Sequence, residues 1–286
     1  MATACGLVTL GLLAAAVVTT GCFDMRYEYP TEASPVQVGS DADWSHLCSG
    51  GAHSCAVREN GTLWCWGRNF MGELGVGDDE VRAAPEQVGE HADWQTVQCG
   101  SRITCGIRED GSLWCWGFNE QRTVAPNTPE DDEEFGPELV PVQIGEQDDW
   151  TSVDAGTDYS CGTREGGTLW CWGNNYDGQL GVGDDEWRTD PTRVGAEEGW
   201  SSVRTARGHS CGIREDATLW CWGREHQGRL GIDSEAPGSV KSPQQVEGDD
   251  WDQVAPGSHH TCGLRDEGTL WCWGTGEYGT LGDEAD

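Results

Sequence analysis

The chain has 286 residues, with 50 Asp and Glu against 17 Lys and Arg, so its formal net charge is −33. A surface this acidic repels phosphate backbones, which argues against nucleic-acid binding. The apolar fraction of 36% is low, whereas 16 Trp and 14 Cys are far above ordinary usage. We therefore expect a core of tryptophan and disulfides, formed in an oxidising compartment.

The N-terminus carries an apolar segment. Residues 6–18 are too short to span a bilayer comfortably but have the length of a signal-peptide hydrophobic region, although no Lys or Arg precedes them. The following residues 19–22 (TTGC) resemble the lipobox of bacterial lipoproteins, with Thr19 in place of the usual aliphatic residue. In that family the cysteine is acylated on sulfur and becomes the first residue after cleavage.

This resemblance implies a lipoprotein-type signal peptide over residues 1–21, lipidation at Cys22 and a polar tether over residues 22–34. We therefore expect a protein that works outside the cytoplasm. Its lipid would anchor it in the cell envelope, at the outer membrane. Simple secretion is the alternative.

The remainder of the chain is a repeat. The block Leu-Trp-Cys-Trp-Gly occurs five times, at intervals of 50, 56, 50 and 51 residues. Its cysteines are Cys65, Cys115, Cys171, Cys221 and Cys272. Ten residues before them lie Cys55, Cys105, Cys161, Cys211 and Cys262, and eleven residues before those lie Trp44, Trp94, Trp150, Trp200 and Trp251. A Pro-x-x-Val/Ile segment precedes each of these tryptophans. Self-similarity at a fixed period predicts a repeat architecture.

Residues 54–67 show what each repeat forms. Two short apolar runs flank Glu59-Asn60-Gly61, and a three-residue hairpin loop favours glycine in third place. Glycine occupies that place in four repeats and Ala217 in the other, where we expect strain. In this register the two hairpin cysteines face each other in a non-hydrogen-bonded pair, whose Cα atoms lie about 4.5 Å apart, within the range of a disulfide.

We therefore predict five cross-strand disulfides, Cys55–Cys65, Cys105–Cys115, Cys161–Cys171, Cys211–Cys221 and Cys262–Cys272. Zinc is the alternative use of paired cysteines, but no C-x-x-C spacing occurs and a facing pair supplies only two ligands. Cys48 and Cys99 remain, in corresponding strands of adjacent repeats. They either form a sixth disulfide or stay as two free buried thiols.

Both faces of each hairpin are apolar. Cys55, Val57, Leu63 and Cys65 share one face, and Ala56, Trp64 and Trp66 share the other. The residue opposite the first indole is always small, in the series Ala56, Gly106, Gly162, Gly212 and Gly263. We expect the facing indole to pack over it. A sheet covered on both faces by copies of itself is a radial or linear stack.

After each hairpin the chain follows the pattern W-G-x-N-x-x-G-x-L-G-x-G, which is clearest in residues 66–77 and 172–183. Together with the hairpin, this unit resembles the regulator of chromosome condensation repeat over residues 35–286. The resemblance implies an all-β fold in which each repeat forms a four-stranded blade of a β-propeller, usually with seven blades. We expect about five four-stranded blades here, with an N-terminal strand at residues 35–38 closing the last. An open arc and a fragment of a longer ring are the alternatives.

The resemblance does not carry an activity over to this chain. The eukaryotic members act on a small GTPase at chromatin, and a charge of −33 has the wrong sign for DNA or an acidic histone surface, so guanine-nucleotide exchange is not expected. His53, His209 and His260 share one column, which favours hydrogen bonds between blades over catalysis. No nucleophile-elbow, metalloprotease, phosphate-loop or dinucleotide motif occurs. We expect no catalytic residues, no cofactor and no metal.

Acidic clusters recur in the connections, at residues 78–80, 184–186 and 130–134. Carboxylates in loops can bind calcium, but no EF-hand or nonapeptide pattern occurs, so a solvated acidic surface is the favoured interpretation. Residues Glu130, Asp131, Asp132, Glu133 and Glu134 lie in the longest, Pro-rich connection. We take them as a candidate partner loop, since long loops on rigid scaffolds often carry function.

These observations favour an exported, lipid-anchored, non-enzymatic propeller that acts as a protein-binding or structural scaffold. We expect a monomer whose membrane contact is its lipid and whose favoured partner is a protein with a cationic surface. One alternative is a secreted enzyme inhibitor, because propellers resembling this family can bind extracellular enzymes. The other is a glycan-acting propeller enzyme, which would need paired carboxylates converging on an axial cleft.

Overall fold

The computed structural model describes residues 34–119, 124, 136–232 and 238–282. The chain divides into two compact units, Met1–Ser40 and Asp41–Asp286, and each is described by itself. The described part of the first unit, residues 34–40, contains no strand. The described part of the second unit holds five antiparallel sheets and one short 3-10 helix, η1 (Glu277–Gly279). No helix among the described residues is long and apolar enough to cross a membrane.

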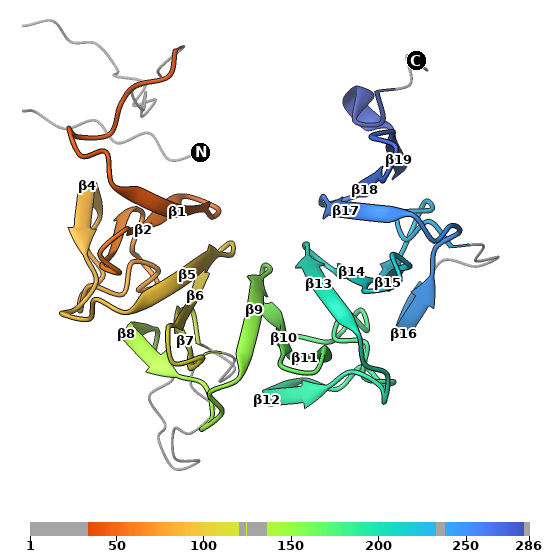
Figure 1. Ribbon diagram of the computed structural model, residues 1–286, viewed down its shortest axis with the longest axis horizontal. Helices are drawn as coiled ribbons and strands as arrows, with labels where there is room; N and C mark the ends of the chain where they lie inside the picture. The colour runs from red at the N-terminus through yellow and green to blue at the C-terminus, as the bar shows by residue number, and fades with distance from the viewer. Residues whose placement is uncertain (1–33, 120–123, 125–135, 233–237, 283–286) are drawn as a thin grey trace, which may run out of the picture. The chain divides into compact units, whose positions relative to one another are not determined.

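The five sheets follow one another along the chain (Figure 1). The first contains β1 (Trp44–Ser49), β2 (His53–Arg58), β3 (Leu63–Gly67) and β4 (Arg82–Gln87). The second contains β5 (Trp94–Cys99), β6 (Ile103–Arg108), β7 (Leu113–Gly117) and β8 (Glu138–Gln143). The third contains β9 (Trp150–Ala155), β10 (Tyr159–Arg164), β11 (Thr168–Gly173) and β12 (Arg188–Arg193). The fourth contains β13 (Trp200–Thr205), β14 (His209–Arg214), β15 (Leu219–Glu225) and β16 (Gly238–Gln245). The fifth contains β17 (Trp251–Pro256), β18 (His260–Arg265) and β19 (Leu270–Gly274).

The two central strands of each sheet form the predicted hairpin. In the first sheet Cys55 pairs with Cys65 and Ala56 pairs with Trp64, and the same register recurs in the other four. The three-residue turn closes through the Arg58 N–H, which donates to the Thr62 carbonyl at 2.9 Å. Gly61 has a φ of 76°, and Ala217 adopts nearly the same left-handed backbone at 60°. The strain expected at Ala217 is therefore present, because an L side chain there disfavours this conformation.

The Pro-x-x-Val segments form the fourth strands. Pro85 lies in β4, which pairs with β3 of the hairpin that precedes it in the chain, and Pro141, Pro191 and Pro243 lie in the corresponding strands β8, β12 and β16. The strand expected at residues 35–38 is not formed, and the fifth sheet has three strands. A connection of 12 to 20 residues joins each fourth strand to the third strand of its own sheet. Residues 35–38 are instead separated from β19 by most of the chain, so pairing with it would carry a larger loop-closure entropy.

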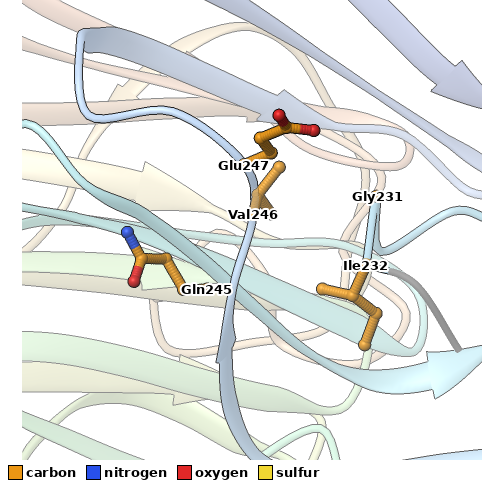
Figure 2. Close-up of a pocket in the computed structure, with 5 residues that line it drawn as sticks. All are labelled: Gly231, Ile232, Gln245, Val246 and Glu247. Carbon is orange, nitrogen blue, oxygen red and sulfur yellow. The ribbon is translucent and has the colours of Figure 1, made fainter.

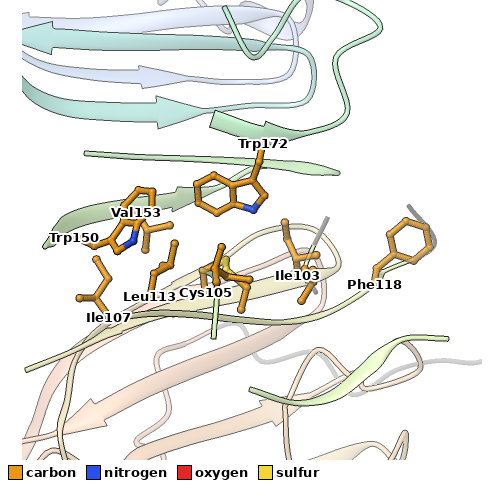
Figure 3. Close-up of a cluster of buried hydrophobic side chains, with 11 residues drawn as sticks. Ile103, Cys105, Ile107, Leu113, Phe118, Trp150, Val153 and Trp172 are labelled. Carbon is orange, nitrogen blue, oxygen red and sulfur yellow. A yellow bond between two sulfur atoms is a disulfide. The ribbon is translucent and has the colours of Figure 1, made fainter. Parts of the chain in front are cut away.

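Consecutive sheets pack face to face. Ile103, Cys105, Ile107 and Leu113 of the second sheet contact Trp150, Val153 and Trp172 of the third, as Figure 3 shows. The same contact joins the first sheet to the second, the third to the fourth and the fourth to the fifth. In each case the face with the disulfide and leucine meets the tryptophan face of the next sheet. The expectation that each sheet is covered by copies of itself is confirmed at these four interfaces.

In the four hairpins whose small residue is glycine, that residue has a different aromatic neighbour from the one expected. A Cβ atom on Gly106 would lie 2.8 Å from the ring of Trp94, which comes from the first strand of that sheet. Gly162, Gly212 and Gly263 lie against Trp150, Trp200 and Trp251 in the same way. The facing indole of Trp114 instead lies 3.9 Å from the Arg108 guanidinium carbon. Hairpin register sets which backbones face each other, but a ring from the neighbouring strand can reach the same space.

The leucine column distinguishes the interfaces from the last sheet. Leu63, Leu113, Leu169 and Leu219 are fully buried against the following sheet, whereas Leu270 is 67% exposed. We expect Leu219→Ala to lower the unfolding free energy by about 2–5 kcal/mol, because it leaves a cavity. Leu270→Ala should cost less than about 1 kcal/mol, because its side chain is mostly solvated. Urea denaturation of the oxidised protein measures both values. Equal losses in the two variants would show that the exposed leucine is in fact packed.

Candidate functional site

All twelve cysteines among the described residues are paired in six disulfides. The five hairpin disulfides join Cα atoms 4.1 Å apart, in the predicted pairs. Cys48 and Cys99 form the sixth, which links β1 to β5 and so joins the first two sheets covalently. The sequence did not determine whether these two cysteines pair or stay as free thiols. In the structure they form a disulfide. These bonds fix the positions of the turns and connections at the sheet ends.

Two of the three histidines in the column connect neighbouring sheets. The His53 Nε2 lies 2.8 Å from the Thr104 hydroxyl, which itself donates to the Glu73 carbonyl, so the imidazole must be the donor. His209 contacts Thr261 in the same way at 2.9 Å. Burial lowers the pKa of His53 to about 4 and that of His209 to about 3. Both side chains are therefore neutral at physiological pH and hold sheets together, as the column predicted.

One repeated contact escaped the sequence analysis. The last residue of each second strand is an arginine, and its guanidinium carbon lies between two indoles at 3.9 to 5.7 Å from their centroids. These arginines are Arg58, Arg108, Arg164, Arg214 and Arg265. Their constant place, three residues after the first hairpin cysteine, was the signal that could have revealed them. Such stacking rigidifies the sheet end that carries the hairpin turn.

The hairpin turns are acidic, and we call them the acidic end. The residue after each stacked arginine is an exposed carboxylate, in the series Glu59, Glu109, Glu165, Glu215 and Asp266. The turns are joined from sheet to sheet. The Trp94 N–H donates to the Gly61 carbonyl at 3.0 Å, and Trp150, Trp200 and Trp251 repeat the bond to the turns before them. Five like charges are thus held in a fixed series, which produces a strong negative potential.

Two of the acidic clusters that the sequence singled out, residues 78–80 and 184–186, lie elsewhere, in the connections that follow the third strands β3 and β11. Asp78 uses one carboxylate oxygen to accept the Glu80 N–H at 2.9 Å and the other to accept the Arg82 guanidinium at 2.7 Å. The hydrogen bond from Arg82 holds the pKa of Asp78 below its usual value. Asp184 makes the corresponding bonds with Glu186 and Arg188. These carboxylates therefore shape their own loops.

Within the described ranges, one group of three side chains has its potential metal ligands close together, namely Cys48, Cys55 and Cys99. All three sulfur atoms belong to disulfides. The buried carboxylates Glu73 and Glu225 belong to different repeats. Glu73 accepts from Arg68 and the Met71 N–H, and Glu225 accepts from the N–H groups of Gly228 and Leu230. The converging pair that a glycan-acting enzyme needs is not formed by these two residues.

A hollow lies beside the fourth sheet and is shown in Figure 2. One wall is Gly231 and Ile232, and the other is Gln245, Val246 and Glu247. These lining residues offer one carboxylate and one amide, and none of them is a nucleophile. A single carboxylate does not form the converging pair that a glycan-acting enzyme needs.

Two predicted sites lie outside the described residues. One is the lipidation site Cys22, and the other is the candidate partner loop formed by Glu130, Asp131, Asp132, Glu133 and Glu134. Both stay predictions.

Comparison with known proteins agrees with this geometry. The sequence model described as the RCC1-like domain matches residues 4–286. Human WBSCR16 superposes with a TM-score of 0.76 at 21% identity, covering 84% of this chain and 64% of that one. Yeast RCC1 (Prp20) bound to Kap60 gives a TM-score of 0.69 at 23% identity, covering 79% and 55%. Prp20p of Saccharomyces cerevisiae, described with its binding to Gsp1p and histones, gives 0.70 at 21% identity, covering 82% and 59%.

At these identities the structural likeness shows the fold alone. This chain spans between 55% and 64% of the length of those three structures. Among curated proteins, no significant match is found.

The buried histidines predict a pH dependence of stability. Their folded pKa values of about 4 and about 3 lie below the unfolded value of 6.5. The unfolded chain therefore takes up protons first, and stability falls as pH drops below 6.5 toward those folded values. Between pH 7 and pH 5 each histidine should cost roughly 1–2 kcal/mol. Urea denaturation across this range should show a smaller loss in His53→Gln and His209→Gln. The exposed His91→Gln is the control, and an unchanged slope in the first two variants would contradict the assignment.

Proposed function

Because this chain belongs to the family of RCC1-like domains, we propose that it is a non-enzymatic, protein-binding scaffold built on a β-propeller. Yeast RCC1 (Prp20) has been solved bound to Kap60, so a relative with this fold does bind a protein. The interior polar groups described above hold sheets and loops together. Function is then left to the surfaces at the ends of the sheets.

The observation that carries the proposal is the acidic end. Its five carboxylates sit on turns that disulfides, arginine stacks and sheet-to-sheet hydrogen bonds hold in place. A rigid surface loses little conformational entropy on binding. A protein with a cationic surface is the partner that this charge attracts, and the attraction also speeds encounter.

The proposal places the protein outside the cytoplasm, with residues 1–21 as signal peptide and Cys22 as the lipid anchor in the outer membrane. Six disulfides support an oxidising compartment, because cytosolic thiols are normally kept reduced. The lipobox-like residues 19–22 support the anchor. We take the working form as a monomer.

The partner surface can be tested with two variants of equal charge change. One neutralises four of the five carboxylates of the acidic end with Glu59→Gln, Glu109→Gln, Glu165→Gln and Glu215→Gln. The matched control neutralises the connections with Asp79→Asn, Glu80→Gln, Asp185→Asn and Glu186→Gln. The chain from residue 23 onward, secreted into an oxidising compartment, is used to capture cationic proteins from envelope extract. The first variant should lose at least about tenfold in captured partner, and raising salt should weaken capture by the unsubstituted chain. Equal capture by both variants would reject the acidic end as the binding surface.

The anchor is tested by Cys22→Ser. We expect the unsubstituted chain to fractionate with membranes and to incorporate labelled fatty acid, because acylation at this sulfur supplies the membrane affinity. The substituted chain should incorporate none. Soluble, unlabelled protein from the unsubstituted gene would favour simple secretion.

A further inference from the structure

The ion pairs of the described residues are unevenly distributed. Nine arginines have a carboxylate oxygen within 4.0 Å, namely Arg58, Arg68, Arg82, Arg102, Arg108, Arg164, Arg188, Arg193 and Arg265. The other five described arginines form no such pair, and all lie within residues 204–229. In a chain with a threefold excess of acids, this concentration of arginines that form no ion pair calls for a physical reason.

Two of the five have structural roles. Arg214 stacks between Trp200 and Trp220, and its repeat has Gly199 where the others have aspartate. Arg204 donates to the Val203 carbonyl of its own strand. Arg207, Arg224 and Arg229 remain, and we call them the arginine cluster.

The arginine cluster forms where the fourth and fifth sheets adjoin, near β14, β15 and β17 (Figure 1). The Arg224 N–H donates to the carbonyl of Gly208, the residue after Arg207, at 2.8 Å. The Arg229 guanidinium donates to the Ser258 carbonyl at 3.0 Å and lies 3.3 Å from the His259 Nδ1. Arginine only donates, so Nδ1 is the acceptor and the neutral ring carries its proton on Nε2. Arg207, Arg224 and His259 are exposed.

Arg229 is the unusual member because it is only 3% exposed. Burial and the nearby charge of Arg224 lower its pKa, against the opposing effect of the Glu225 and Asp177 carboxylates. Glu225 is close in sequence, but its two carboxylate oxygens accept the N–H groups of Gly228 and Leu230. Arg229 forms no ion pair within 4.0 Å, and a buried charge without such a partner is costly, so the position is suited to an anion from outside.

The first repeat shows the alternative arrangement. There Arg68 pairs with buried Glu73 at 2.8 Å and donates to the Ser101 carbonyl. Arg224 and Arg229 occupy the corresponding positions, and Ser258 corresponds to Ser101. Arg229 has thus replaced the acid and taken over the bond to the serine carbonyl. Arg224 keeps the place of Arg68 but forms no ion pair within 4.0 Å. The Asp177 carboxylate and the Arg224 side chain both lie beside Gly208.

We infer that Arg207, Arg224 and Arg229, together with His259, bind a compact tetrahedral oxyanion, a phosphate or sulfate group. Guanidinium groups match such oxyanions with paired, charge-assisted hydrogen bonds. The three guanidinium groups and the imidazole N–H together offer many donors. A tetrahedral oxyanion, with more oxygens than a carboxylate, can accept more of them. Desolvation and the charges of Arg229, Arg207 and Arg224 lower the pKa of His259, and the Glu277 carboxylate opposes them. A long polyanion would extend beyond the cluster, and the net charge of −33 on the chain would repel its remaining groups.

The test is calorimetric titration of inorganic phosphate into the exported full chain carrying Cys22→Ser, at constant ionic strength set with sodium chloride. The chain should bind phosphate, and the exposed-site variant Arg224→Gln should bind at least about tenfold more weakly, since a charge-assisted contact is lost. Arg229→Glu recreates the Arg68–Glu73 pair and should abolish binding. Arg229→Gln introduces the residue found at the equivalent position 179, so the fold tolerates it, and should also weaken binding.

The matched control is Arg193→Gln, which removes an exposed arginine that pairs with Glu198 in another repeat and should leave phosphate binding unchanged. Sulfate should bind like phosphate, and acetate more weakly. Three results would overturn the site: no phosphate binding by the chain beyond the effect of sodium chloride, equal weakening by Arg193→Gln and Arg224→Gln, or acetate binding as tight as phosphate. Tighter binding of long-chain polyphosphate per phosphate group would overturn the compact ligand. If circular dichroism shows that Arg229→Glu does not fold, phosphate binding by Arg224→Gln decides whether the site exists.

Discussion

Every sheet after the first places its tryptophan face on the disulfide and leucine face of the sheet before it. This one contact recurs four times and buries the largest side chains of the core, Trp116, Trp172 and Trp222 among them. Each such burial contributes on the order of 2 kcal/mol or more. The loop glycines Gly75, Gly181 and Gly231 complete the contact, because a Cβ atom at each would collide with the indole of the next sheet. The hairpin disulfides keep the two central strands in the register that this packing requires.

The polar interior follows the same repeat. Imidazole–threonine bonds cross from one sheet to the next, and stacked arginines close the sheet end beside each hairpin turn. These groups are desolvated and hydrogen-bonded or stacked, so they add rigidity and little reactivity. The features that differ from repeat to repeat lie at the ends of the sheets. The hairpin turns form the acidic end, and the opposite ends of the fourth and fifth sheets carry the arginine cluster, so the two ends would favour ligands of opposite charge.

The spacings within each repeat predicted much of this architecture from local sequence. A three-residue turn with glycine in third place was enough to set the register, and the register alone placed Cys55 opposite Cys65. The small residue at Gly106 was correctly found, but its aromatic cover comes from Trp94, because ring contacts depend on how neighbouring strands lean. The acidic end went unnoticed, since Glu59 and its counterparts are single residues scattered at intervals of about 50 and not a run in the sequence.

The sequence by itself determined the all-β repeat, the hairpin register, the five hairpin disulfides and the structural role of the histidine column, because each follows from spacings within one repeat or from one column. Only the tertiary structure decided that Cys48 joins Cys99, that residues 35–38 form no strand, and that Arg207, Arg224 and Arg229 form no ion pair within 4.0 Å. Those outcomes depend on distances between groups that lie far apart along the chain. Such distances are set by how the sheets pack, and no pattern within a single repeat records them.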